Sequence, residues 1–208
     1  MVQELSYDTA ITVIDSWEVL RRKENYAETL GCGLLTKFFS EQPDAMGIFG
    51  IETNSIEEQE EAFERLLTSK HFLELARNYV ALIDQAVDTL GPDLETLTQV
   101  LLELGDLHHQ EYGIKTEWYP VLGVALLQSL EEILGKENFA PNIKACWLQV
   151  YEALTMAMTS SMVGKNVVCY DYHHGDDSSA AIYPSEDFSI QAVDARSRPQ
   201  RQRCASYS

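Results

Sequence analysis

Apolar residues recur every three or four positions along most of the chain, which is the spacing of one face of an α-helix. The stretches with this pattern are residues 8–24, 26–41, 71–89, 94–110, 116–134 and 141–163. The capping box Ser55-Ile-Glu-Glu58 predicts a further, polar helix through about Leu67. Pro43 ends the second stretch, and a short turn then leads to Phe49. No stretch before residue 164 alternates apolar and polar positions as a strand does. We therefore expect an all-α fold of seven to eight helices with mostly short connections.

The end of the chain differs from the rest in composition. It contains the polar run Gly175-Asp-Asp-Ser-Ser179 and an arginine-rich segment from Arg196 to Arg203, and it shows no helical periodicity. A segment of this composition buries too little apolar surface to offset the entropy lost on ordering. We expect a folded domain over residues 1–164 and a mostly disordered tail over residues 165–208.

The charge balance restricts the partners. The chain has 33 acidic and 15 basic residues, a formal net charge of −18, and the tail holds only six of these acids and five of these bases. The domain is therefore strongly acidic, which disfavours binding to nucleic-acid phosphates or to anionic membranes. We also find no apolar run long enough to span a bilayer, no secretory pattern and no CxxC pair. A cytoplasmic protein with reduced thiols is the expectation.

Familiar catalytic motifs are absent from the sequence. It has no GxSxG, no HExxH, no phosphate-binding loop and no GxGxxG that opens a helix. A di-iron carboxylate bundle would need inward Glu-x-x-His motifs, and the domain has none. Its candidate chemistry therefore depends on three histidines, His71, His108 and His109.

His108 holds the most informative position of the three. It follows Leu104 by four residues on an apolar stripe that includes Leu97 and Leu101, so it points inward. His109 is rotated by about 100° and faces the side of the helix or solvent. Two interpretations of His108 are open at this point. It is either a hydrogen-bonded core histidine or an axial ligand to a metal or haem.

A series of further marks occurs in a characteristic order and spacing. The marks are Trp17, Pro43, Phe49, Leu104-Gly-Asp-Leu-His108, Tyr112-Gly-Ile114, Tyr119-Pro-Val-Leu-Gly123 and Trp147-Leu-Gln-Val-Tyr151. With them, residues 8–163 resemble the globin family, specifically single-domain haem globins of the neuroglobin and flavohaemoglobin-like kind. The resemblance implies the globin fold and haem b, iron protoporphyrin IX, as cofactor. It does not extend to the tail.

The resemblance implies a proximal histidine that ligates the iron, and two residues compete for this role. His108 matches when the count runs forward from Leu104, because globins keep an apolar residue one turn before the ligand. His109 matches when the count runs back from Tyr119. We prefer His108, since choosing His109 would put Gly105 where the apolar residue belongs.

The resemblance also implies the other side of the pocket. Leu75 takes the place of the usual distal histidine and Tyr79 lies one turn deeper, while a register one turn later puts Tyr79 itself in the distal position. Neither register supplies a histidine, so six-coordinate iron is not expected unless His71 swings in. Phe49 matches the phenylalanine that packs on haem. The implied haem-contacting set is Leu35, Phe49, Leu75, Tyr79, Leu104, His108, Ile114 and Tyr119, with His108 as the iron ligand.

The leading functional hypothesis is a globin that binds O₂, NO or CO reversibly, as in oxygen transport. A hydrogen bond from Tyr79 would favour O₂ by about 1–3 kcal/mol, whereas a Tyr79 that points away would favour CO or NO. We lean against an enzyme, because NO dioxygenation would need an external reductase. The alternative is a haem-based gas or redox sensor that signals through the arginine-rich end. A globin-like carrier of another chromophore is disfavoured by His108, Phe49 and Pro43 together.

Overall fold

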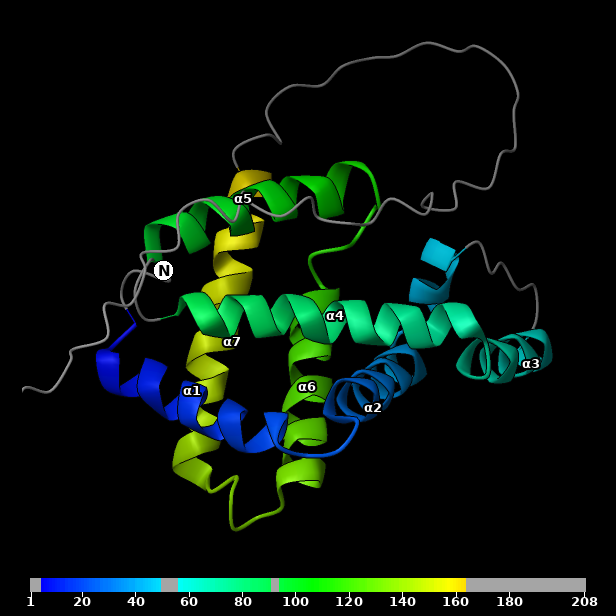
Figure 1. Cartoon of the computed structure of the whole chain (residues 1–208). Helices are drawn as coiled ribbons and strands as arrows, with labels where there is room; N and C mark the ends of the chain where they lie inside the picture. Colours follow the sequence, from blue (N-terminus) through cyan, green and yellow to red (C-terminus); the bar gives the residue numbers. More distant parts are fainter. Residues whose placement is uncertain (1–4, 50–55, 91–93, 164–208) are drawn as a thin grey trace, which may run out of the picture. The chain divides into compact units, whose positions relative to one another are not determined.

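The computed structural model describes residues 5–49, 56–90 and 94–163, which belong to one compact unit. All regular structure in these ranges is helical, as Figure 1 shows. The elements are α1 (Tyr7–Arg21), α2 (Tyr26–Glu41), η2 (Pro43–Phe49), α3 (Ile56–Leu67), α4 (Lys70–Thr89), α5 (Leu94–Gln110), α6 (Trp118–Leu134) and α7 (Pro141–Val163). The predicted all-α fold is confirmed. The predicted tail lies outside the described residues.

Local capping explains where several helices begin and end. The Ser6 hydroxyl accepts a hydrogen bond from the Thr9 amide at the start of α1, and Ser69 caps the Phe72 amide at the start of α4 in the same way. Each serine thereby satisfies one of the backbone donors left free in a first helical turn. Gly135 adopts a positive φ of 76° and ends α6.

The helices cross in pairs, and the most extensive contacts join α5 to α7, α2 to α4, α2 to α6 and α1 to α7 (Figure 1). Two of these crossings depend on glycine. A Cβ atom on Gly31 of α2 would overlap the backbone of Ala76 in α4. A Cβ atom on Gly105 of α5 would overlap the carbonyl oxygen of Met158 in α7. Gly105 therefore sets which face of α5 rests on α7.

A polar cluster lies between α1, α2 and α4, and we call Trp17, Arg21, Tyr26 and Asp84 the Asp84 cluster. Oδ1 of Asp84 accepts hydrogen bonds from the Trp17 indole at 2.6 Å, the Arg21 Nε at 2.8 Å and the Tyr26 hydroxyl at 3.3 Å. The Trp17 side chain is fully buried, so its N–H must find a partner inside the protein. The cluster joins the consecutive helices α1 and α2 to α4, which is distant in sequence.

A second tryptophan completes this part of the core. The Trp147 ring of α7 lies 5.5 Å from the Trp17 ring, measured between centroids, and its indole N–H donates to the Ser16 hydroxyl at 2.8 Å. The two tryptophans thus fasten the first helix to the last. Within the described residues, no helix is long and apolar enough to cross a membrane.

Candidate functional site

The last turns of α5 present the two competing histidines in different surroundings. The His108 side chain is half-buried, whereas His109 is exposed to solvent. The difference follows from the helix geometry, because Gly105 rests on α7 and Leu101 is buried in the core. His108 is then directed toward the start of α6.

His108 pairs with Tyr119 on the first turn of α6. The Nδ1 atom of His108 lies 3.1 Å from the Tyr119 hydroxyl oxygen, within hydrogen-bonding distance. The two rings are stacked, with centroids 6.3 Å apart and an interplanar angle of 19°. Tyr112 meets the His108 ring edge-on, with centroids 6.4 Å apart. The imidazole is therefore held between aromatic rings on one side of α5.

The connection from α5 to α6 creates this pairing. The Ile114 amide donates to the His108 carbonyl at 2.9 Å, which closes the end of α5. Gly113 has a positive φ of 62°, a conformation that glycine adopts without strain. The chain thus turns within a few residues, and Tyr119 comes to face His108.

Burial keeps the site uncharged at neutral pH. It lowers the pKa of His108 to about 4, so the imidazole is neutral, and it raises the pKa of Tyr119 to about 12. Burial also raises the pKa of Tyr79, and the nearby Tyr119 raises it further. A neutral imidazole retains a lone pair, which is the form that ligates metals.

Tyr151 of α7 supports Tyr119 from a third helix. Its hydroxyl donates to the Tyr119 carbonyl at 2.7 Å, and its own pKa is raised by burial and by Tyr79 and Tyr119. A Cβ atom on Gly123 would overlap the Tyr151 ring, so the glycine makes room for it. Tyr151 and Gly123 have no role that the sequence alone predicts. Their only signal was that both belong to motifs in the globin-like series.

The remaining residues singled out from the sequence differ in how far they are buried. Leu75, Tyr79, Leu104 and Ile114 are half-buried against the apolar core, and Leu35 is buried within it. Of these, Tyr79 interacts electrostatically with Tyr119 and so belongs to the group around His108. Phe49 is the last residue of η2, and its side chain lies outside the described part. His71 is exposed near the start of α4.

The side chains around His108 limit the kind of metal that the site could bind. In the described ranges, no three histidine, cysteine, aspartate or glutamate side chains gather as a metal cage. One neutral imidazole in aromatic and aliphatic surroundings suits a metal whose other ligands come with it. Haem iron is such a metal, since the porphyrin supplies four nitrogens and the protein an axial histidine. The residues around His108 therefore fit haem.

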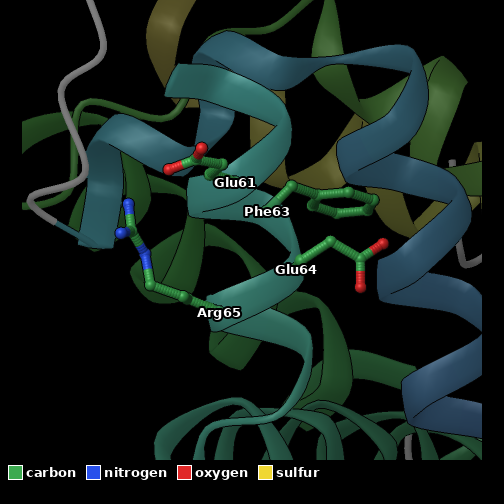
Figure 2. Close-up of a pocket in the computed structure, with 4 residues that line it drawn as sticks. All are labelled: Glu61, Phe63, Glu64 and Arg65. Atoms are coloured by element: carbon green, nitrogen blue, oxygen red, sulfur yellow. The ribbon is translucent and has the colours of Figure 1, made fainter. Parts of the chain in front are cut away.

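A separate hollow of about 510 Å³ lies beside α3. Figure 2 shows Phe63 and Glu64 on one side of α3 and Glu61 and Arg65 on the other. None of these four residues belongs to the predicted haem-contacting set. This charged hollow is distinct from the group around His108.

The chain is similar in sequence to known proteins. The family model described as Globin matches residues 33–158. The chain is 32% identical to neuroglobin of Danio rerio over 158 residues, which are 76% of this chain and 92% of the relative. It is 30% identical to neuroglobin of Dissostichus mawsoni with the same coverage.

One solved structure shows the same fold at lower sequence identity. It is described as a hexacoordinated heme protein from an anhydrobiotic tardigrade at pH 4. The TM-score is 0.63 at 19% identity, and the match covers 77% of this chain and 96% of that one. At this identity the likeness concerns the fold alone.

Proposed function

The chain belongs to the globin family, and from this premise we propose that His108 ligates the iron of haem b and that the iron binds a diatomic gas reversibly. The observation that carries the proposal is the state of the His108 ring. It is half-buried and neutral, and Tyr119 occupies its Nδ1 atom. The Nε2 atom is then the ring nitrogen available for a metal. When bound, haem supplies an iron centre whose ligand preference depends on the axial histidine and on the polarity of the opposite side.

The exposure of the two histidines supports His108 over His109. His108 is half-buried and His109 is exposed, so His108 is better shielded from water than His109. For His109 to ligate the iron, its side chain would have to turn inward from solvent. This would require α5 to rotate away from α7. That rotation would drive Gly105 out of its close contact with Met158.

The residues on α4 would determine which gas is preferred. Leu75 offers no hydrogen bond, so a gas beside it is held in apolar surroundings. Tyr79 is protonated at neutral pH, and burial raises its pKa further above the ordinary value of a tyrosine. We infer that its hydroxyl donates to the gas ligand and favours O₂.

The iron ligand is tested by the visible spectrum of the purified protein. A Soret band that shifts on reduction and again on CO addition is expected. His108→Ala should lose the haem, and His109→Ala, the matched control on the same turn, should retain it. Protein that stays colourless after haem reconstitution, or the reverse pattern in the two variants, would overturn the proposal.

The role of Tyr79 is tested by the rate of O₂ dissociation. Tyr79→Phe should speed dissociation about 10-fold, because one hydrogen bond to the ligand is removed. Tyr26→Phe makes the same chemical change in the Asp84 cluster and should leave the rate unaltered. Equal rates in the Tyr79 variant and the wild type would contradict the assignment.

Three finer points also belong to the proposal. We take residues 1–164 as the globin domain and a cytoplasmic location as the working assumption. Redox turnover of NO would require an external reductase. The sensor alternative depends on Arg196–Arg203, which lie outside the described part of the chain, so the structure adds nothing in its favour.

A further inference from the structure

We infer that Tyr119 is the residue that positions the iron ligand, because its hydroxyl oxygen accepts a hydrogen bond from Nδ1–H of His108. Tyr151 and Gly123 in turn hold Tyr119 in place. The inference rests on the proposed role of His108 as the haem ligand. It assigns a task to three residues of α6 and α7, two of which were given no task by sequence reasoning.

The position of the proton on the neutral imidazole decides which ring nitrogen can bind iron. Such a ring carries one N–H and one lone pair, and the position of the proton defines the tautomer. A phenol hydroxyl can either donate or accept a hydrogen bond. If Tyr119 donated to Nδ1, the proton would sit on Nε2 and no lone pair would remain there for iron. If Tyr119 accepts from Nδ1–H, the lone pair of Nε2 is free. Ligation through Nε2 therefore requires Tyr119 to be the acceptor.

The acceptor also determines how basic the ligand becomes. A metal-bound histidine usually hydrogen-bonds to a carboxylate, a backbone carbonyl or water, and this partner fixes its orientation. Among the described residues, the His108 ring shares a side-chain hydrogen bond with the Tyr119 hydroxyl rather than with a carboxylate. A phenol hydroxyl is uncharged at neutral pH. The imidazole is consequently oriented without acquiring much negative charge.

The position of Tyr119 is itself fixed from two sides. Its amide donates to the Thr116 carbonyl at 3.3 Å, which tightens the start of α6. On the α7 side, the Tyr151 hydroxyl donates to the Tyr119 carbonyl at 2.7 Å. The Tyr151 ring can lie this close to α6 because residue 123 has no side chain. A path of direct contacts thus runs from Gly123 through Tyr151 and Tyr119 to His108.

Tyr119→Phe is the most direct variant, because it keeps the ring and removes only the hydroxyl. In the protein without haem, ¹⁵N NMR of the His108 ring should show the Nδ1–H tautomer in the wild type. The variant should shift toward Nε2–H. The signals that disappear in His108→Ala identify those that belong to His108. The same tautomer in wild type and variant would overturn the inference.

The ferrous haem protein supplies a second readout. The iron–histidine stretching frequency, measured by resonance Raman, should fall in Tyr119→Phe, and haem affinity should fall about 10-fold or more. Tyr151→Phe should lower the frequency by a smaller amount. It also keeps the test decisive if the first variant folds poorly. Tyr26→Phe is the matched control and should leave the frequency unchanged.

Failure of this inference differs visibly from failure of the proposed function. If His108→Ala still shows the iron–histidine band, His108 is not the ligand and both ideas are wrong. If that band disappears with His108 but stays at its frequency in both tyrosine variants, only the positioning role of Tyr119 is wrong.

Discussion

The Asp84 cluster and the group around His108 both place polar side chains among apolar helices, yet they use their hydrogen-bonding capacity differently. Asp84 receives three donors on one oxygen atom, and Arg21 is shared with Glu18 and Asp88. The charges of this cluster are thus compensated by neighbours. The His108 ring is neutral and has one hydrogen bond, at Nδ1.

This difference distinguishes a structural cluster from a binding site. A buried group whose partners are all present stabilises the fold and has no reason to bind anything further. The half-buried His108 ring uses one nitrogen in a hydrogen bond with Tyr119, and its second nitrogen keeps a lone pair that can bind a metal. Changes in the Asp84 cluster should therefore reduce stability, and changes at His108 should reduce haem binding.

The largest effect on stability is expected for Trp17→Ala. Trp17 is fully buried, packs on Trp147 and donates to Asp84, so truncation leaves a cavity and removes one of the three hydrogen bonds to Asp84 Oδ1. We expect unfolding to become easier by about 3–5 kcal/mol. Urea unfolding followed by circular dichroism measures this, and the haem spectrum of the folded fraction should stay normal. A loss under about 1 kcal/mol would contradict the structural role.

An intermediate effect is expected for Asp84→Asn, at about 2 kcal/mol near neutral pH, because charged hydrogen bonds are weakened. Burial acts to raise the pKa of Asp84. The hydrogen bonds from Arg21 and Trp17 and the charge of Arg21 outweigh burial and hold the pKa below its usual value. As pH falls, the Asp84 carboxylate of the unfolded protein therefore takes up a proton before that of the folded protein does. The stabilisation is complete above about pH 4 and is lost as pH falls through the lower folded pKa.

The pH dependence of that variant is the sharper measurement. The stability difference between wild type and Asp84→Asn should be constant from pH 7 to pH 5 and should shrink below about pH 4. Asp88→Asn is a matched control, since Asp88 is largely exposed and also bonds Arg21, and its effect should stay under about 1 kcal/mol. A difference that does not change with pH would show that the charge of Asp84 is not what stabilises the fold.

The smallest effect on stability is expected for His108→Ala in the protein without haem. One hydrogen bond on a half-buried side chain is lost, so the cost should be about 1 kcal/mol, with His109→Ala within about 0.5 kcal/mol. Urea unfolding of both apoproteins measures the difference. A cost above about 3 kcal/mol would favour the other interpretation open from the sequence, a core histidine with a structural purpose.

Much of the fold could be predicted from local pattern. The periodicity of α4 and α5 depends only on the spacing of apolar residues within each helix, and the stop at Pro43 follows from its missing N–H group. The expected inward direction of His108 and outward direction of His109 agree with their observed exposure, because one residue along a helix always means about 100° of rotation. The comparisons confirm the family suggested by the order of motifs.

The partners of the site could not be predicted in the same way. Tyr119 is 11 positions from His108, and their contact depends on the turn at Gly113 and the closure of α5 by Ile114. Tyr151 is 32 positions from Tyr119 and reaches it only because α6 and α7 lie close together at Gly123. Neither contact leaves a periodic signal in the sequence.

The sequence by itself thus determined the helices, the family and the candidate iron ligand, since periodicity, capping and motif order are properties of neighbouring residues. Only the tertiary structure decided which polar groups meet. It brought hydrogen-bond donors from α1 and α2 to Asp84, and it placed the His108 ring in one hydrogen bond with Tyr119. Hydrogen bonds and burial act over a few ångströms in space, whatever the distance along the chain. The same pattern of apolar spacing therefore leads to a structural cluster at Asp84 and to a candidate ligand site at His108.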